Sequence, residues 1–232
     1  SFSKKYFTEK FQKLGLENYK YRNYDISDIE EFPFVIYQQE DEFQGFSVTI
    51  PYKQSIIKYL DEVDVDAKKI GAVNTIKVTE DNRLIGYNTD VYGFQKSIEP
   101  LLKKHHKKAL ILGTGGASKA VAYALNKLDI AYEFVSRNVS ENSLLYSILS
   151  QQFMEEYTII INCTPLGTHP NIDDSPNIPY EFITEKHLLF DLIYNPSETK
   201  FLQEGKKRGA IIKNGLEMLE LQAEKSWEIW NS

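Results

Sequence analysis

The apolar positions of residues 108–213 follow a pattern in which short strands alternate with helices. Continuous apolar runs predict strands at residues 108–112, 132–136, 158–162, 188–193 and 210–213. Helical periodicity predicts helices between them at residues 116–128, 141–151 and 198–208. Strands that alternate with helices at this spacing are typical of a parallel sheet with helices on both faces. The pattern therefore predicts a doubly wound α/β domain in this part of the chain.

The first ninety residues have a less regular pattern. Helical periodicity predicts a helix at residues 4–14, capped by Ser3, and further helices at 34–39, 53–60 and 63–69. Alternation predicts strands at 19–24 and 46–50, and a hairpin in which strands 73–78 and 84–88 flank an Asp81-Asn82 turn. Thr89 is expected to cap a helix that reaches about residue 104. A last helix is predicted over Leu216–Trp230.

Composition and charge exclude several classes of protein. Hydrophobic residues make up 42% of the 232, which is enough apolar material for a core, and no long uncharged apolar run predicts a membrane span. The net charge of −6, without a stripe of Lys and Arg, argues against nucleic-acid binding. A single cysteine and no visible signal peptide favour a cytoplasmic protein. The chain opens at Ser1, so we expect either that a short N-terminal piece is missing or that the numbering begins late.

The histidines and the cysteine carry no recognisable metal or nucleophile pattern. His105 and His106 are adjacent, and His169 and His187 are isolated, so we expect no metal site. Cys163 has no accompanying base motif, and we interpret it as a packing residue.

A glycine-rich turn, Gly-Thr-Gly-Gly-Ala-Ser at residues 113–118, follows an apolar strand and opens a helix. Gly113 permits the tight turn, and Gly115 lets the backbone approach a pyrophosphate at the helix N-terminus. Ser118 stands where a third glycine is usual. A turn that only joins strand to helix is the alternative, but the strand and helix on either side favour dinucleotide binding.

The next predicted strand ends in Ser136-Arg137, without a carboxylate. NAD-selective sites usually place Asp or Glu there for the ribose hydroxyl, whereas Arg137 could pair with a 2′-phosphate. This strand end favours NADP over NAD.

Three polar side chains of the first half, Lys53, Asn74 and Asp90, lie at or near the ends of predicted strands. Each alone has a structural explanation: a helix-start lysine, a turn former, and a charge in the first turn of a helix. Together, and upstream of a dinucleotide turn, they favour a functional role more strongly than any one of them does alone.

The sequence resembles the shikimate dehydrogenase family along almost its whole length. The resemblance rests on ordered blocks: Ser-Phe-Ser (1–3), Val-Thr-Ile-Pro-Tyr-Lys (48–53), Gly-Ala-Val-Asn-Thr (71–75), Gly-Tyr-Asn-Thr-Asp (86–90), the turn at 113–118, Asn-Cys-Thr-Pro-Leu-Gly (162–167), Asp-Leu-Ile-Tyr-Asn-Pro (191–196) and Asn-Gly-Leu-Glu-Met-Leu-Glu-Leu-Gln-Ala (214–223). Eight blocks in this order are far more specific than a lone glycine motif.

The resemblance implies a role for each matching residue. The catalytic pair would be Lys53 and Asp90. Substrate would be bound by Ser1, Ser3, Thr49, Asn74, Tyr194 and Gln222. NADP would be bound by Gly113, Gly115, Gly116, Ala117, Ser136, Arg137, Thr164, Gly215 and Met218. Glu141 departs from the family pattern, because a second basic residue often helps to hold the 2′-phosphate there.

The resemblance also implies the architecture and the reaction. We expect a two-domain α/β protein, with residues 1–90 plus 214–232 as the substrate-binding domain and 91–213 as a Rossmann-type NADP domain. The implied reaction is the reversible NADPH-dependent reduction of 3-dehydroshikimate to shikimate, on the route to chorismate and the aromatic amino acids. A lysine ammonium would polarise the ketone and give the proton, and the aspartate would orient it. We expect a small-molecule substrate, no nucleic-acid or membrane partner, and a monomer or homodimer.

Three alternatives stay open at the level of the sequence. One is an NAD-using quinate/shikimate dehydrogenase, which the missing acid beside Arg137 disfavours. Another is a non-catalytic, shikimate-binding regulator of the same fold, against which Lys53 and Asp90 argue. The third is a folate-type methylene dehydrogenase, which would not need the paired serines.

Overall fold

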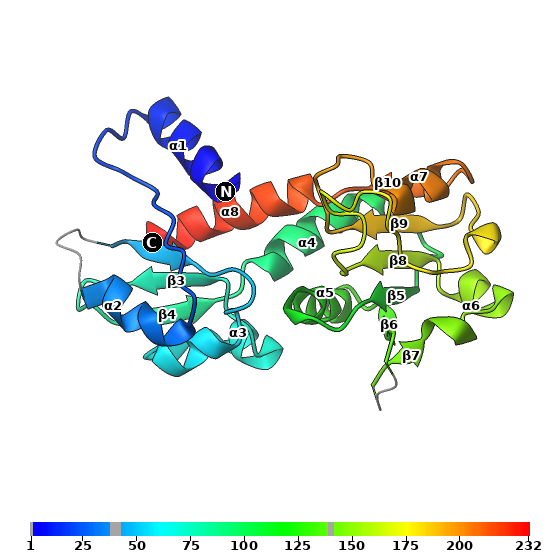
Figure 1. Ribbon diagram of the computed structural model, residues 1–232, viewed down its shortest axis with the longest axis horizontal. Helices are drawn as coiled ribbons and strands as arrows, with labels where there is room; N and C mark the ends of the chain where they lie inside the picture. The colour runs from blue at the N-terminus through cyan, green and yellow to red at the C-terminus, as the bar shows by residue number, and fades with distance from the viewer. Residues whose placement is uncertain (1, 38–42, 139–141) are drawn as a thin grey trace. The chain divides into compact units, whose positions relative to one another are not determined.

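The computed structural model describes residues 2–37, 43–138 and 142–232 (Figure 1). The chain separates into two compact units, Ser1–Gln44 and Gly45–Ser232. We describe each unit by itself.

The first unit holds α1 (Phe2–Leu14), the 3₁₀ turn η1 (Ile29–Glu31) and α2 (Phe32–Tyr37). The predicted strand at 19–24 is wrong: no described strand pairs with this extended segment. Its aromatic side chains pack on α1 instead, with ring centroids 5.0 Å apart for Phe7 and Tyr21 and 5.6 Å apart for Phe11 and Tyr19. Alternation here therefore reflects packing on a helix, not a sheet.

The predicted helix boundaries in this unit need two corrections. Ser3 lies inside α1, which begins at Phe2, so Ser3 is not the cap of this helix. The helix predicted at 34–39 is α2, which begins two residues earlier because the η1 turn leads directly into it. Residues 38 and 39 lie outside the described residues.

The second unit begins with a mixed sheet in the strand order β1-β3-β4-β2. Its strands are β1 (Gly45–Ser47), β2 (Glu62–Val63), β3 (Thr75–Val78) and β4 (Leu84–Tyr87). The predicted hairpin is confirmed, because β3 and β4 pair in antiparallel register and Asn82 of the turn is left-handed at φ 59°.

The helices predicted at 53–60 and 63–69 are both shorter than expected. The first is a 3₁₀ segment, η2 (Ser55–Tyr59), and the second is α3 (Val65–Ile70). Residues 62 and 63 pair with β4, and the Asp64 side chain accepts from the Asp66 N–H at 3.0 Å, so the helix can begin only after Asp64.

A parallel sheet in the order β10-β9-β8-β5-β6-β7 follows, which confirms the predicted α/β fold class. Its strands are β5 (Lys108–Leu112), β6 (Ala131–Ser136), β7 (Leu144–Leu145), β8 (Ile159–Asn162), β9 (Leu188–Asp191) and β10 (Ile211–Lys213). Its helical segments are α5 (Gly116–Lys127), η4 (Tyr146–Ile148), α6 (Gln151–Glu156), η5 (Tyr180–Phe182) and α7 (Lys200–Lys206).

The helix predicted at 141–151 is wrong. Leu144 and Leu145 form the edge strand β7, paired with Val135 and Ser136 of β6, and Glu141 lies outside the described residues. Pairing with β6 gives backbone hydrogen-bond partners to these two residues, and this outweighs the weak helical periodicity of the sequence.

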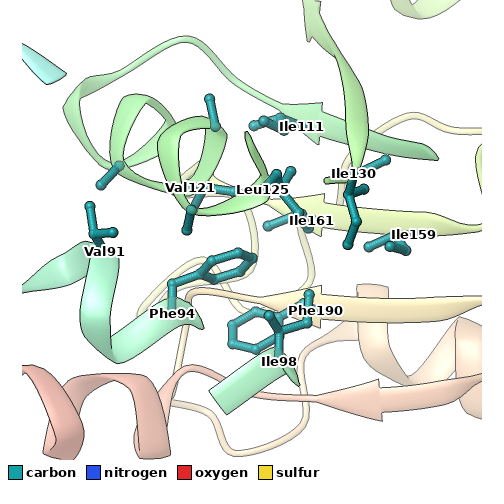
Figure 2. Packing of buried hydrophobic residues seen from close by; sticks show 14 of the residues in the cluster. Val91, Phe94, Ile98, Ile111, Val121, Leu125, Ile130, Ile159, Ile161 and Phe190 are labelled. Atoms are coloured by element: carbon teal, nitrogen blue, oxygen red, sulfur yellow. The ribbon is translucent and has the colours of Figure 1, made fainter. Parts of the chain in front are cut away.

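Helix α4 (Asp90–Ile98) joins the two sheets, and the turn η3 (Glu99–Leu101) ends it well before residue 104. Its residues Val91, Phe94 and Ile98 belong to the apolar core of the parallel sheet (Figure 2). The Phe94 and Phe190 rings meet edge to face with centroids 5.0 Å apart. Asp90 is therefore the first residue of a helix that is packed into the apolar core.

Helix α8 (Leu216–Trp230) packs beside α4 and reaches the mixed sheet (Figure 1). The buried Trp230 indole donates to the Ile76 carbonyl at 2.9 Å and so attaches α8 to β3. The assignment of residues 1–90 plus 214–232 and 91–213 to separate functional domains stays a prediction. Within the described ranges, the helices are too short or too polar to cross a membrane.

Close approach of α4 and α8 depends on Gly93. A Cβ there would lie 2.4 Å from the Met218 carbonyl oxygen, which belongs to a helix backbone and cannot rotate away. We expect Gly93→Ala to lower the free energy of unfolding by about 1–3 kcal/mol through overpacking, although alanine favours helices. Urea unfolding measures this loss.

Gly205→Ala in α7 is the matched control for that substitution. Its Cβ would meet the end of the Leu189 side chain, which can shift, so its cost should be smaller. Equal losses in the two variants would contradict the packing explanation.

Candidate functional site

A partly buried ion pair joins Lys53 to Asp90. The Lys53 Nζ lies 2.6 Å from Asp90 Oδ2, and the two side chains are 16% and 10% exposed. Lys53 lies in the turn after β1, and its carbonyl accepts from the Val73 N–H at 2.7 Å. Because water is largely excluded, this attraction is stronger than that of a surface pair. The structure thus brings together the two residues predicted to be catalytic.

The carboxamide of Asn74 holds the other oxygen of the same carboxylate. Its Nδ2 donates to Asp90 Oδ1 at 2.9 Å, and its Oδ1 accepts from the Thr89 N–H at 2.7 Å. Asn74 is only 4% exposed. Each Asp90 oxygen therefore has a donor, and the two bonds fix the orientation of the carboxylate.

Gln222 reaches this cluster from α8. Its Oε1 accepts from Asn74 Nδ2 at 3.3 Å, and its Nε2 donates to the Leu219 carbonyl at 2.9 Å. A turn, the residue before β3 and two helices thus contribute to one cluster of Lys53, Asn74, Asp90 and Gln222, all of them predicted site residues.

The other predicted substrate residues lie elsewhere in the described chain or outside it. Thr49 is exposed in the turn before Lys53, and Tyr194 is exposed after β9. Ser3 is in α1 of the first unit, and Ser1 lies outside the described residues. Their roles stay predictions.

Three buried hydroxyls beside the cluster were missed by the sequence reasoning. Thr75 Oγ1 lies 2.7 Å from Ser226 Oγ and 3.2 Å from Thr89 Oγ1, and the last two oxygens are 3.1 Å apart. The available signals were local: Thr75 follows Asn74, Thr89 precedes Asp90, and Ser226 lies one helical turn beyond Gln222. Thr89 makes no side-chain cap to α4, because its hydroxyl joins this group instead.

The glycine turn at 113–118 connects β5 to α5 and has the geometry of an anion cradle. Gly113 is left-handed at φ +102°, and Cβ atoms added to Gly115 or Gly116 would meet no other atom within 4 Å. Ala117 is the second residue of α5, whose first turn carries no carboxylate. The Ser118 hydroxyl donates to the Gly115 carbonyl at 2.6 Å and closes the turn. The open N–H end of α5 fits a phosphate group.

Neighbouring strand ends place further predicted cofactor residues at the same sheet edge. A Cβ on Gly113 would lie 3.2 Å from Thr164 Cγ2, so the loops after β5 and β8 are adjacent. Thr164 is fixed by Asn162, whose Oδ1 accepts its hydroxyl at 2.7 Å. Ser136 ends β6, beside β5, and the exposed Arg137 follows it. A guanidinium at this edge suits an oxyanion such as a phosphate.

Gly215 and Met218 have packing roles in the structure. A Cβ on Gly215 would lie 2.1 Å from the Leu192 carbonyl oxygen, and Met218 is buried in the apolar core. Contact of either residue with a cofactor stays a prediction.

Asp191 is a buried carboxylate that ties the ends of β8 and β9. It accepts from Asn162 Nδ2 at 3.0 Å, from the Ile193 N–H at 3.0 Å and from the Thr199 hydroxyl at 2.5 Å. Burial raises its pKa to about 6, although these three hydrogen bonds act in the opposite direction. The loops at this edge therefore depend on a group that titrates near neutrality.

Cys163 packs against the core of the parallel sheet, which confirms its interpretation as a packing residue. Burial raises the pKa of its thiol, so the nucleophilic thiolate is disfavoured. In the part of the chain that the structure describes, His, Cys, Asp and Glu form no group of three or more that could hold a metal ion.

Comparison with known proteins identifies relatives along most of the chain. Residues 1–76 match the family model of the shikimate dehydrogenase substrate binding domain. A shikimate dehydrogenase (NADP(+)) of Methanococcus maripaludis is 41% identical over 228 residues, which cover 92% of this chain and 81% of the relative.

Solved structures give the same result. Shikimate dehydrogenase 1 from Peptoclostridium difficile superposes with a TM-score of 0.82 at 39% identity, covering 100% of this chain and 87% of that chain. Shikimate 5-dehydrogenase from Thermus thermophilus, in complex with NADP(H) and shikimate, has a TM-score of 0.86 at 30% identity and covers 99% of this chain and 88% of that chain.

The raised pKa of Asp191 predicts a pH-dependent stability. Because the folded state binds this proton more tightly than the unfolded chain, the contribution is complete below about pH 4 and is lost as the pH rises through about 6. Relative to Asp191→Asn, which does not titrate, the free energy of unfolding should fall by up to about 3 kcal/mol between pH 4 and pH 7. Urea unfolding of both proteins across this range checks it, and a difference that rises with pH would contradict the assignment.

Proposed function

The chain belongs to the shikimate dehydrogenase family, and on this premise we propose that it catalyses the reversible NADPH-dependent reduction of 3-dehydroshikimate to shikimate. The observation that carries the proposal is the 2.6 Å pair of Lys53 and Asp90, with Asn74 on the second carboxylate oxygen. A reduction of this kind needs a proton donor at the ketone oxygen, and this cluster offers one.

Lys53 acts as the proton donor and electrostatic catalyst. Its ammonium polarises the substrate carbonyl and gives the carbonyl oxygen a proton as the alcohol forms; in the oxidation direction it accepts that proton. Asp90 orients Lys53 through Oδ2 and accepts a hydrogen bond from a neighbouring ring hydroxyl. The nearly complete burial of Asn74 keeps the carboxylate in one orientation.

The remaining polar residues recognise the substrate. Asn74 and Gln222, with the turn residue Thr49, would hold ring hydroxyls, and Ser1 and Ser3 would hold the carboxylate. Tyr194 would line the site. A polyhydroxylated acid needs a partner for each buried group, so an analogue that lacks one leaves a protein group unpaired.

NADP is the cofactor that the sheet edge fits. Gly113, Gly115, Gly116 and Ala117 would receive its pyrophosphate, for which the open space before Gly115 and Gly116 leaves room. Arg137, next to Ser136, would bind the 2′-phosphate, and no carboxylate stands there to prefer NAD. Thr164, Gly215 and Met218 would complete the site. When bound, the nicotinamide ring supplies or accepts the hydride.

The two functional domains would be residues 1–90 plus 214–232 for the substrate and 91–213 for NADP. We place the enzyme in the cytoplasm, as a monomer or homodimer with a small-molecule substrate.

One spectrophotometric assay tests the proposal. Shikimate and quinate are each offered with NADP+ and with NAD+, and nicotinamide reduction is followed by its absorbance. Turnover of shikimate with NADP+ supports the proposal. Preference for NAD+ and quinate would identify the alternative dehydrogenase, and shikimate binding without turnover would identify a regulator.

Removal of the Lys53 ammonium should abolish most of the activity. We expect Lys53→Ala to lower kcat by about 100- to 10,000-fold, the usual contribution of a positioned proton donor, with a modest change in the KM for shikimate. Lys96→Ala is the control, because Lys96 pairs with Glu99 at the exposed surface. Near-normal turnover in Lys53→Ala would contradict the mechanism.

A methyl group added at Gly115 should weaken the binding of NADP+ without affecting the binding of shikimate. Gly115 has φ −76° and ψ −177°, which alanine adopts without strain, and its added Cβ would face open space. We expect Gly115→Ala to raise the KM for NADP+ at least tenfold. The melting temperature and the KM for shikimate should stay close to those of the unchanged protein. An unchanged KM for NADP+ would place the cofactor elsewhere.

A further inference from the structure

We infer that Thr75 and Ser226 are positioning residues of this active site, which act on the substrate through Asn74 and Gln222. The inference rests on the proposed function and extends it to two side chains outside the predicted site. Both are almost completely buried, Thr75 on β3 and Ser226 on α8.

The orientation of the Asn74 amide is fixed by its neighbours. Its Oδ1 lies 2.7 Å from the Thr89 N–H, a donor that cannot reverse its role. Nδ2 must therefore face the acceptors on the other side, Asp90 Oδ1 at 2.9 Å, Thr89 Oγ1 at 3.0 Å and Gln222 Oε1 at 3.3 Å. Two amide protons are shared among these three oxygens. Any group that moves Thr89 or Gln222 therefore changes how firmly Asn74 holds Asp90.

The hydroxyls of Thr75 and Ser226 contact both Thr89 and Gln222. Ser226 Oγ donates to the Gln222 carbonyl at 2.9 Å and lies 2.7 Å from Thr75 Oγ1. Thr75 Oγ1 is also 3.2 Å from Thr89 Oγ1 and 3.3 Å from Asn74 Oδ1. The group connects β3, the start of α4, and α8 at one point, and Thr89 Oγ1, 3.4 Å from Gln222 Oε1, links it to the Gln222 amide.

The arrangement does more than satisfy buried oxygens. Three hydroxyls could satisfy one another anywhere in a core, but here Thr89 contacts both predicted substrate-binding amides, those of Asn74 and Gln222. Thr75 also contacts the Asn74 amide, and none of the three hydroxyls is exposed. Removal of one hydroxyl takes one hydrogen-bond partner from each of its neighbours and loosens the hold on the two amides. The predicted consequence is a defect in substrate recognition that is separate from cofactor binding.

Thr75→Val tests this role, because valine keeps the shape and removes only the hydroxyl. We expect the KM for shikimate to rise at least fivefold and kcat to fall at least threefold, while the KM for NADP+ changes less than twofold. Thr75→Ser restores the hydroxyl and should recover shikimate kinetics to within twofold of the unchanged protein. Ser226→Ala should give the same pattern as Thr75→Val, and it decides the matter if Thr75→Val does not fold.

A double-mutant cycle separates positioning from simple packing. Because part of the effect of Thr75 passes through Asn74, Thr75→Val should lower kcat/KM by a smaller factor in an Asn74→Ala background than in the unchanged protein. An additive loss in that background, or unchanged shikimate kinetics in Thr75→Val and Ser226→Ala, would overturn the inference. The unchanged protein is the control for the function: if it turns over no shikimate with NADP+, the proposed function itself fails, whereas active protein with unaffected variants contradicts only the positioning roles.

Discussion

The carboxylate of Asp90 sets the constraint on which the site depends. It is almost fully buried, so each of its oxygens needs a donor, and Lys53 and Asn74 supply them. Lys53 stands on a turn whose backbone is tied to Val73, and Asn74 begins the hairpin beside it. The mixed sheet and α4 must therefore hold their relative positions for the charge to stay compensated. The Phe94–Phe190 contact secures α4 from the side of the parallel sheet.

The glycines of this protein divide by what surrounds them. Gly93 and Gly215 face main-chain oxygens at distances that no side chain could occupy, so packing is enough to require glycine at both positions. Gly115 and Gly116 face open space, and nothing in the fold itself forbids a larger residue there. A sequence motif cannot distinguish these two kinds of glycine. The geometry distinguishes a glycine that brings two elements together from one that leaves room for something else.

The parallel sheet could be predicted because its strands are continuous apolar runs, and burial on both faces requires that pattern. The alternation at residues 19–24 wrongly predicted a strand, because these side chains pack on a helix. The periodicity at 141–151 wrongly predicted a helix, because Leu144 and Leu145 pair with β6 as an edge strand. The site divides in the same way. Lys53, Asn74, Asp90 and Gln222 stand in recognisable sequence blocks, so they could be predicted. Ser226 could not, because its contact with Thr75 joins residues that are 151 positions apart in the sequence.

The position of α8 has a consequence for how the protein matures. This helix contributes Gln222 and Ser226 to the site, and its Trp230 indole bonds to the mixed sheet. The residues that Gln222 contacts, Asn74 and Thr89, are translated more than 130 residues earlier. A nascent chain that is still on the ribosome would already carry Lys53 and Asp90, but with their polar surroundings incomplete. The polar surroundings of the Lys53–Asp90 pair are then complete only once α8 has packed against α4 and the mixed sheet.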